Sequence, residues 1–310
     1  MTRPLKIGIF ISAMNGGMKD GALGWRDLHD MAIRSEQIGF DSFWIPDHLI
    51  FKHPDQPVHG PWECWSLIAA LAATTTRMEL GSLVSCISFR NPGLMAKMAD
   101  TIDEISGGRL ILGLGAGWHE PEYQAFGYPF DHRFERFDEA ATVITSLLRT
   151  SHADFHGDYY TLDDCELRPR GPRPSGPPIM IGALANRPRM LGLAVKHADI
   201  WNGWLLNTRS DISELAPMRD AVDLACEKAG RDPVSLERSV GIGVDQRPAA
   251  EIGTGMVPGA VPMSGEPEAI ADQIRQFAEQ GISHIQIAPM VQGVAGLEAL
   301  VPVLESLDAG

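Results

Sequence analysis

Hydrophobic positions along the chain alternate between two patterns, one typical of buried strands and the other of amphipathic helices. Residues 5–11 form a nearly continuous apolar run, as expected of a strand that is buried on both faces. Residues 25–38 then carry apolar side chains at helical spacing, and Gly39 follows where a glycine commonly ends a helix. The same alternation continues almost to the end of the chain.

This alternation predicts eight strand–helix units. The expected strands are 5–11, 41–46, 78–84, 109–114, 179–181, 199–202, 235–244 and 282–288. The expected helices are 25–38, 62–75, 91–105, 133–149, 188–196, 211–229, 268–280 and 297–307. Short joints between the units favour a parallel sheet with right-handed crossovers, and eight units favour a closed barrel over an open sheet. The predicted fold class is therefore α/β, a (β/α)8 TIM barrel with insertions.

Two stretches interrupt the alternation. Residues 151–178 contain the sequence HGDYYTL, which predicts a small hairpin, followed by a run rich in Pro, Arg and Gly. Residues 246–265 are rich in Gly, Pro and Ala and show no periodicity. Because strand–helix units are needed on both sides of each stretch, we interpret both as parts of one domain spanning residues 1–310, with 151–178 as an insertion. A barrel of this class takes about 250 residues, which fits the length of the chain.

The composition of the chain indicates which kinds of partner it can bind and in which cellular compartment it works. The net charge of −14 makes the chain a poor partner for nucleic acid or for an anionic membrane. Its four cysteines form no CxxC pair, which favours neither a zinc site nor a disulfide framework and indicates a reducing compartment. The apolar run near the start is too short for a typical signal peptide, and nothing approaches 18 consecutive apolar residues. We expect a cytoplasmic protein with no nucleic-acid or membrane partner.

In a barrel of this class the active site lies at the carboxyl ends of the strands. His48 follows the second expected strand directly, beside Asp47, where an imidazole can titrate near neutrality and transfer protons. Asp47, His48, His53 and His59 together suggest a metal cluster, but no HExxH pair or comparable ligand spacing accompanies them. We expect no metal and take His48 as the catalytic candidate.

Two glycine-containing segments also follow expected strands. Gly113, Gly115 and Gly117 leave room for a flat ring or for a closely approaching backbone. They are not a dinucleotide fingerprint, because Trp118 stands where the third glycine of GxGxxG would fall. The stretch 182–186 opens a helix, so its N–H groups suit a phosphate; the alternative is an ordinary tight turn.

Three sequence blocks resemble the luciferase-like monooxygenase superfamily, and within it the coenzyme F420-dependent oxidoreductases. The blocks read IGFDSFWIPDH, LGSLVSCISFRNPGLMAKMADTIDEISGGRLILGLGAGWHEPEYQAFG and ADIWNGW, and the similarity covers almost the whole chain. The resemblance implies a (β/α)8 barrel, in agreement with the strand count. It also implies a small-molecule substrate, a homodimer and a separate reductase for the cofactor.

By position, the resemblance implies roles for individual residues. His48 matches the active-site histidine, and Cys86-Ile87 matches a bulge with a non-prolyl cis peptide behind the cofactor ring. The other residues that it implies around the cofactor are Asp47, Ser85, Gly115, Ala116, Gly117, Trp118, Glu122, Arg136, Gly182, Ala183, Leu184, Arg187 and Trp204. One departure matters: sugar-phosphate dehydrogenases of the superfamily carry a catalytic glutamate where Trp118 stands here, and Glu120 and Glu122 are shifted from that register. This argues against a sugar phosphate as substrate.

We therefore expect hydride transfer between F420 and a small organic substrate, in a pocket framed by Trp118, Trp204 and the loops 51–61 and 246–265. The alternative within the superfamily is an FMN-dependent monooxygenase that uses reduced flavin and O₂. Another alternative is a barrel that is not an enzyme and only carries or senses the cofactor. The presence of His48 disfavours it.

F420 carries a phosphodiester and a tail rich in carboxylates, whereas the chain is strongly acidic. A local cluster of cations is needed to bind such a ligand. Five arginines in one stretch of sequence are the candidates for it, with a solvated surface as the alternative: Arg168, Arg170, Arg173, Arg187 and Arg189.

Overall fold

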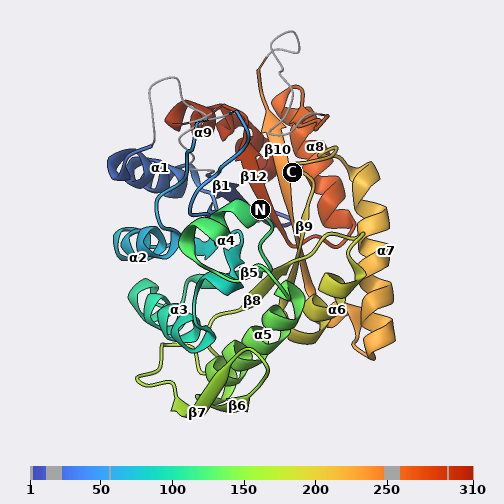
Figure 1. The fold of residues 1–310 in the computed structure, drawn as a ribbon. Coiled ribbons are helices and arrows are strands. Elements are labelled where there is room, and N and C mark those ends of the chain that lie inside the picture. Colours follow the sequence, from blue (N-terminus) through green and yellow to red (C-terminus); the bar gives the residue numbers. More distant parts are fainter. Residues whose placement is uncertain (1–2, 12–22, 56, 248–258, 292, 310) are drawn as a thin grey trace.

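The computed structural model of the protein is a closed parallel barrel surrounded by helices (Figure 1). It describes residues 3–11, 23–55, 57–247, 259–291 and 293–309. In order around the barrel, the strands are β1 (Lys6–Phe10), β2 (Ser42–Ile45), β3 (Glu79–Ser82), β5 (Leu110–Gly115), β8 (Ile179–Gly182), β9 (Ile200–Trp204), β10 (Glu237–Asp245) and β12 (His284–Pro289). The last strand pairs with the first, which closes the barrel. The predicted (β/α)8 class is confirmed.

Helices cover the outside of this barrel (Figure 1). They are α1 (Trp25–Ile38), α2 (Cys64–Thr74), α3 (Pro92–Ser106), α4 (Glu120–Phe126), α5 (Arg133–Thr150), α6 (Pro188–His197), α7 (Ile212–Ala229), α8 (Pro267–Glu279), α9 (Val294–Ala299) and α10 (Val301–Ala309). Their ends follow the sequence: Gly39 ends α1 in the left-handed region, and the Asn91 side chain accepts two backbone N–H groups at the start of α3. None of the helices in the described ranges is both long and apolar enough to cross a bilayer.

Three elements differ from the predicted ones. The third barrel strand ends at Ser82 instead of continuing to residue 84, and pairing with β5 resumes in the two-residue β4 (Ser85–Cys86). The helix α4 was not expected, because seven residues that include a proline give little periodicity. The last expected helix is two helices that meet at Leu300.

The insertion contains the expected hairpin. β6 (His152–His156) and β7 (Thr161–Glu166) pair antiparallel, and the hairpin packs against α5 at the lower edge of Figure 1. The base of the hairpin follows the end of α5, at the amino-terminal end of the barrel, whereas its tip reaches the start of α5, where Tyr159 lies against His132 and Arg136. In the stretch 246–265, β11 (Met263–Ser264) pairs with the end of β10, while 248–258 fall outside the described residues.

The barrel interior carries polar side chains toward its amino-terminal end, where His284 is in register with Lys6 and Ser42 with Glu79, and an apolar cluster toward its carboxyl end. Trp44 Nε1 donates to Ser42 Oγ at 2.6 Å, and Ser42 Oγ lies 2.7 Å from His284 Nε2. Burial lowers the pKa of His284 to about 3, so this imidazole is neutral near pH 7. On the other side of the interior, Asn202 Nδ2 donates to Ser239 Oγ and to Gln286 Oε1. These bonds satisfy most of the buried polar atoms, which would otherwise be costly to bury, although Nε2 of Gln286 has no partner among the described residues.

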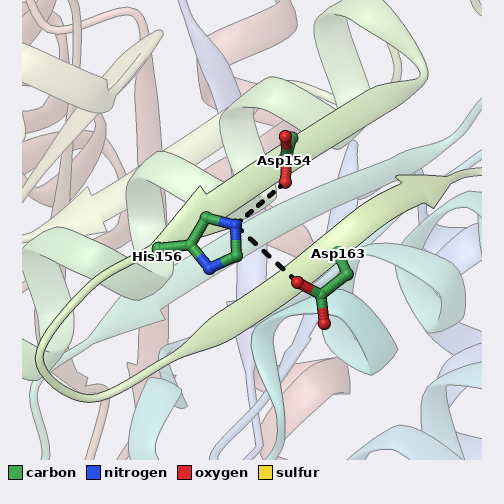
Figure 2. Close-up of side chains that lie close together, drawn as sticks. All are labelled: Asp154, His156 and Asp163. Carbon is green, nitrogen blue, oxygen red and sulfur yellow. Dashed lines mark ion pairs between the residues drawn. The ribbon is translucent and has the colours of Figure 1, made fainter.

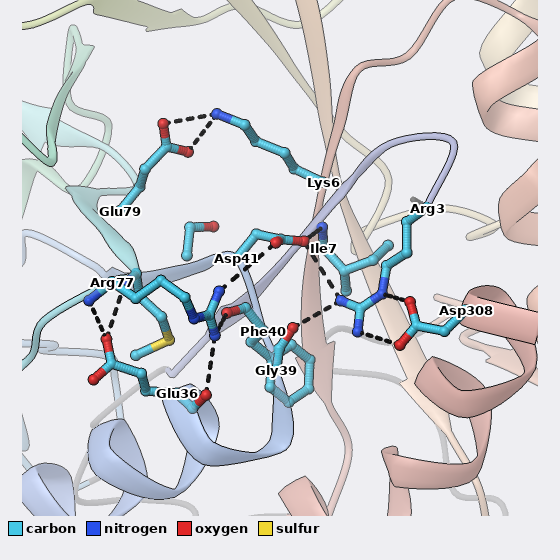
Figure 3. Close-up of polar contacts among 12 residues, drawn as sticks. Arg3, Lys6, Ile7, Glu36, Gly39, Phe40, Asp41, Arg77, Glu79 and Asp308 are labelled. Atoms are coloured by element: carbon cyan, nitrogen blue, oxygen red, sulfur yellow. Dashed lines mark hydrogen bonds and ion pairs between the residues drawn. The ribbon is translucent and has the colours of Figure 1, made fainter. Parts of the chain in front are cut away.

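Charged residues join segments at the amino-terminal end of the barrel (Figure 3). Arg3 donates to Asp308 of α10 and to the carbonyl oxygen of Gly39, which ties both ends of the described chain to the end of α1. Lys6 at the start of β1 pairs with Glu79 at the start of β3. This end of the molecule is held together by its own ion pairs.

A glycine inside the barrel gives a stability test. A Cβ at Gly113 would overlap the carbonyl oxygen of Ser82, a backbone atom that cannot rotate away. We predict that Gly113→Ala lowers the free energy of unfolding by about 1–3 kcal/mol, the range for overpacking a core. The matched control is Gly192→Ala in α6, where the space is open; it should raise stability by up to about 1 kcal/mol through helix propensity. Urea unfolding of both variants measures this, and an unchanged Gly113→Ala midpoint would contradict the packing described.

Candidate active site

The carboxyl ends of the strands surround an apolar floor. Phe10, Leu83, Val84, Trp204 and Met290 belong to one apolar cluster that closes the barrel interior at this end. Phe10 and Trp204 pack edge to face, with their ring centroids 5.5 Å apart. Such a floor is suited to the flat, apolar face of a ring system.

Beside this floor the structure pairs His48 with Glu122. The Nδ1 atom of His48 lies 3.0 Å from Oε1 of Glu122, whose other oxygen accepts the Leu49 N–H at 2.9 Å. Glu122 is buried, whereas 19% of the His48 side chain is exposed. Because a carboxylate only accepts, this geometry places a proton on Nδ1 and leaves Nε2 as the nitrogen that can exchange a proton with a substrate.

Glu122 therefore positions His48. It was expected among the residues around the cofactor, and its pairing with the histidine was not foreseen. The pairing depends on α4, which turns Glu122 inward while its neighbours Glu120 and Gln124 face solvent.

Aromatic side chains surround the histidine. The ring of His48 lies 4.5 Å from that of Phe51 and 5.6 Å from that of Trp118, centroid to centroid. Trp118 is 60% exposed, so a large apolar surface stands free next to the imidazole. Of the expected pocket residues, Trp118 and the described part of the loop 51–61 thus lie beside His48, and Trp204 lies in the floor.

Asp47 is buried and makes its contacts within the protein. Arg90 donates to both carboxylate oxygens, at 2.6 and 3.0 Å, and the Cys86 N–H donates to one of them at 3.1 Å. Arg90 also reaches Glu63, the residue that caps α2. Burial raises the pKa of Asp47 and the charge of Arg90 opposes that rise. The carboxylate thus ties the end of β2 to the segment after β3, and Arg90 and Glu63 are partners that sequence reasoning missed.

The segment after β3 carries one correction. The non-prolyl cis peptide joins Leu83 to Val84, and the expected one at Cys86-Ile87 is not there. The physical reason is the length of β3: the chain leaves the sheet after Ser82 and rejoins it at Ser85, so the bend falls between these residues. Val84 consequently contributes its side chain to the apolar floor.

The expected ring-binding side chains of this segment are internal. Ser85 Oγ accepts from Trp65 Nε1 and donates to Ser82 Oγ, and Ile87 is fully buried. Cys86 Sγ lies 2.8 Å from the Tyr123 hydroxyl, and burial raises the pKa of the Cys86 thiol to about 12. A thiol that stays protonated is a packing residue rather than a nucleophile.

The glycines at the end of β5 and directly after it lie close to other parts of the protein. A Cβ at Gly115 would meet the Val84 side chain, and one at Gly117 would overlap the Tyr123 hydroxyl. Gly117 also has a positive φ of 71°. Protein atoms therefore lie close to both glycines, and room for a flat ring beside them stays a prediction. Ala116 between them is nearly buried.

The loop from β8 to α6 keeps the features of an anion site. Ala183 donates its N–H to Asn202 and accepts from Trp201 Nε1, which fixes the loop next to Gly182. Leu184 is exposed, and α6 begins after Arg187 without a side-chain cap on its first N–H groups. An uncapped helix start together with a cation fits a phosphate.

The expected cluster of five arginines is wrong for three of its members, which lie away from the candidate site. Arg170 pairs with Asp100, and Arg173 pairs with Asp103 and donates to the carbonyl oxygen of Leu110 at the start of β5. These contacts lie at the amino-terminal end of the barrel, as does Arg168 on the same inserted segment, where it pairs with Glu166. The chain segments before and after β8 lie at opposite ends of that strand, so only Arg187 and Arg189 are at the carboxyl end.

Arg136 lies on α5 outside the floor. Its guanidinium donates to Asp131 and stacks over the ring of Tyr159 at 4.4 Å.

A group of possible metal ligands lies on the hairpin (Figure 2). Oxygens of Asp154 and Asp163 lie 3.3 and 3.7 Å from Nε2 of His156, and all three side chains are exposed. The hairpin packs on the outside of α5, and the contacts that the structure describes for these three side chains reach neither His48 nor the apolar floor.

The buried pair Asp47–Arg90 gives the second prediction. Arg90→Ala leaves a buried carboxylate without its partner and should lower the free energy of unfolding by about 3–5 kcal/mol near pH 7. Without Arg90 the pKa of Asp47 in the folded state rises further, so the folded variant takes up a proton more readily than the unfolded chain does. The deficit relative to wild type should therefore shrink as the pH falls through that raised pKa.

Urea unfolding at pH 8 and pH 5 measures this dependence. Arg168→Ala, which removes an exposed Arg–Glu pair, is the matched control and should change stability little at either pH. An equal deficit of Arg90→Ala at both pH values would assign the loss to packing instead of to the carboxylate.

Comparison with known proteins places the chain in a family. The profile of the luciferase-like monooxygenase family matches residues 5–251. An F420-dependent glucose-6-phosphate dehydrogenase from Intrasporangium calvum is 29% identical over 308 residues, covering 85% of this chain and 89% of that protein. Pyrimidine monooxygenase RutA from Cronobacter sakazakii is 35% identical over 175 residues, which are 55% of this chain and 50% of that protein.

Solved structures agree with the barrel. An F420-dependent secondary alcohol dehydrogenase in complex with an F420–acetone adduct has a TM-score of 0.78 at 21% identity, covering 98% of this chain and 99% of that one. EDTA monooxygenase from Chelativorans sp. BNC1 has a TM-score of 0.81 at 15% identity, covering 99% and 94%. The first curated relatives are matched over about half of their length, and the relatives include both F420-dependent and monooxygenase members. On the family profile and the barrel together, the chain belongs to the luciferase-like monooxygenase family.

Proposed function

We propose that this protein is an F420-dependent oxidoreductase that transfers a hydride between the coenzyme and a small organic substrate. The observation that carries the proposal is the His48–Glu122 pair at the edge of the apolar floor, because it provides a positioned proton-transfer group next to a ring-binding surface. The similarity to an F420-dependent dehydrogenase along most of both chains supports the choice of cofactor.

The residues present fit the coenzyme. Val84, Leu83 and Trp204 would support the flat ring, and Arg187 with the uncapped start of α6 would hold the phosphate. When bound, F420 supplies the hydride chemistry, accepting or donating it at the ring. The protein does the rest: it orients the substrate and excludes water, and Nε2 of His48 holds or takes up a proton at the substrate atom beside the one that exchanges the hydride.

The surroundings of His48 favour an uncharged, partly apolar substrate. Exposed Trp118 and the ring of Phe51 stand beside the imidazole. By its resemblance to the family, Trp118 also stands where sugar-phosphate dehydrogenases carry a glutamate. Although a glucose-6-phosphate dehydrogenase is among the relatives, these apolar side chains argue against a sugar phosphate as substrate here.

A second candidate is an FMN-dependent monooxygenase that uses O₂ and receives reduced flavin from a separate reductase. The similarity to pyrimidine monooxygenase RutA favours it, and the apolar floor accommodates either ring.

Binding of the two cofactors to the purified protein decides between the candidates. We expect F420 to bind at least about tenfold more tightly than FMN, which corresponds to about 1.4 kcal/mol. Titrations followed by absorbance and by the fluorescence of the deazaflavin give both dissociation constants. Binding of reduced FMN alone, with O₂ consumption, would overturn the F420 assignment in favour of the second candidate.

His48→Ala should lower turnover by about 10²-fold or more, the contribution of a positioned acid–base group. Cofactor affinity should change little, because the phosphate is held elsewhere. The measurements are kcat in steady-state assays and the cofactor dissociation constant, with His152→Ala on the remote hairpin as control. Equal losses of rate and of affinity would make His48 a binding residue instead.

A further inference from the structure

His119, directly before α4, is an almost completely buried histidine that the proposed reaction does not use. Only 4% of its surface is exposed, and its ring lies 5.4 Å from that of Phe51, 5.1 Å from that of His53 and 5.2 Å from that of Trp118, centroid to centroid. Its Nε2 atom accepts the backbone N–H of Lys52 at 3.1 Å. This bond joins the start of α4 to the loop that follows β2.

The bond requires a neutral imidazole. A ring nitrogen that accepts from an N–H carries no proton, so the proton of His119 is on Nδ1. Burial lowers the pKa of His119; the charge of Glu122 opposes this change, and the imidazoles of His53 and His48 add to it. The ring is therefore neutral near pH 7 and can accept the Lys52 N–H.

The loop after β2 is anchored on both sides of Phe51. The Leu49 N–H donates to Glu122 at 2.9 Å, and the Lys52 N–H donates to His119. Both acceptors belong to the turn that begins α4. They therefore fix the backbone of the loop from the same side.

A cavity separates part of this loop from α4. Its volume is about 520 Å³, and it is lined by Lys52, His53, Pro54, Pro121, Gln124 and Ala125. Apolar packing between the loop and the helix is thus incomplete here. The hydrogen bond from Lys52 to His119, at the edge of the cavity, holds the loop where side chains do not fill the space.

Phe51 is the side chain that this bond positions. Its ring centroid lies 4.5 Å from that of His48, and only 7% of its surface is exposed. Phe51 thus forms a wall on one side of the imidazole, and Trp118 stands on another. A shift of the loop would uncover His48 to water.

We propose that His119 is a positioning residue for the reaction, which holds Phe51 against His48 by accepting the Lys52 N–H. The inference rests on the proposed function for the role of His48. A water-excluding wall beside the imidazole favours proton exchange with the substrate over exchange with solvent.

Two substitutions of His119 separate its acceptor from its ring. His119→Phe keeps an aromatic ring and removes the acceptor, whereas His119→Gln keeps an acceptor on a side chain of similar reach and removes the ring. His53→Phe is the matched control, because His53 lies in the same group of rings and the structure describes no hydrogen bond from it to the loop backbone.

Two measurements report on the loop without coenzyme or substrate. Hydrogen exchange followed by mass spectrometry gives the protection of the peptide that contains the Lys52 amide. Diethyl pyrocarbonate, which acylates an accessible imidazole nitrogen, gives the exposure of His48. In His119→Phe we expect the Lys52 amide to exchange about tenfold faster and His48 to react at least about threefold faster, from the loss of one hydrogen bond. His119→Gln and His53→Phe should stay within about twofold of wild type in both measurements, because each keeps an acceptor for Lys52.

Unchanged rates in His119→Phe would overturn the proposal, since packing alone would then hold the loop. Equal acceleration in both His119 variants, or an acceleration that spreads to peptides of the barrel strands, would also overturn it, by assigning the effect to the ring or to a general loss of stability. Neither measurement involves the coenzyme, so these outcomes leave the proposed function standing. Failure of the proposed function is seen separately, in the cofactor titrations.

Discussion

The contact between the buried carboxylate of Asp47 and the guanidinium of Arg90 is the constraint on which the candidate site depends. It joins the end of β2 to the backbone of Cys86 and, through Glu63, to the start of α2. His48 follows Asp47 directly, so fixing that carboxylate also fixes where the imidazole emerges. A buried ion pair of this kind adds little net stability compared with apolar packing, but it admits few alternative arrangements. The main effect of this ion pair is to fix the positions of the side chains in the candidate site.

Periodicity was sufficient to predict the barrel, because strands buried on both faces and amphipathic helices leave distinct patterns. The helix 25–38 and the hairpin in the insertion were predicted for the same reason. What the pattern could not give is where a strand leaves its sheet. Residues 78–84 are apolar enough to be one strand, yet pairing stops at Ser82, because the bend is a matter of backbone direction and not of hydrophobicity. The short helix α4 was missed because seven residues carry too little periodicity.

The place of a residue in the strand–helix alternation also decides whether its part in the candidate site could be predicted from the sequence. His48 could be chosen because it follows a strand directly, whereas its partner Glu122 could not, since the pairing needs the turn of α4. The arginines show the opposite case. Arg173 and Arg189 are close in sequence, but one precedes β8 and the other follows it, so they lie at opposite ends of the barrel. The predicted order of strands and helices already implied this separation, but grouping the arginines by their distance in sequence ignored it.

Pairing between β1 and β12 has a consequence for how the protein is made. Of the described strands, β1 is synthesised first, but one of its two neighbours is β12, more than 270 residues later in the chain. At about 5–20 residues per second, synthesis separates the two by roughly 15–60 s. During that interval the edge of β1 that later meets β12 has no native partner. The barrel therefore cannot close until β12 has been synthesised.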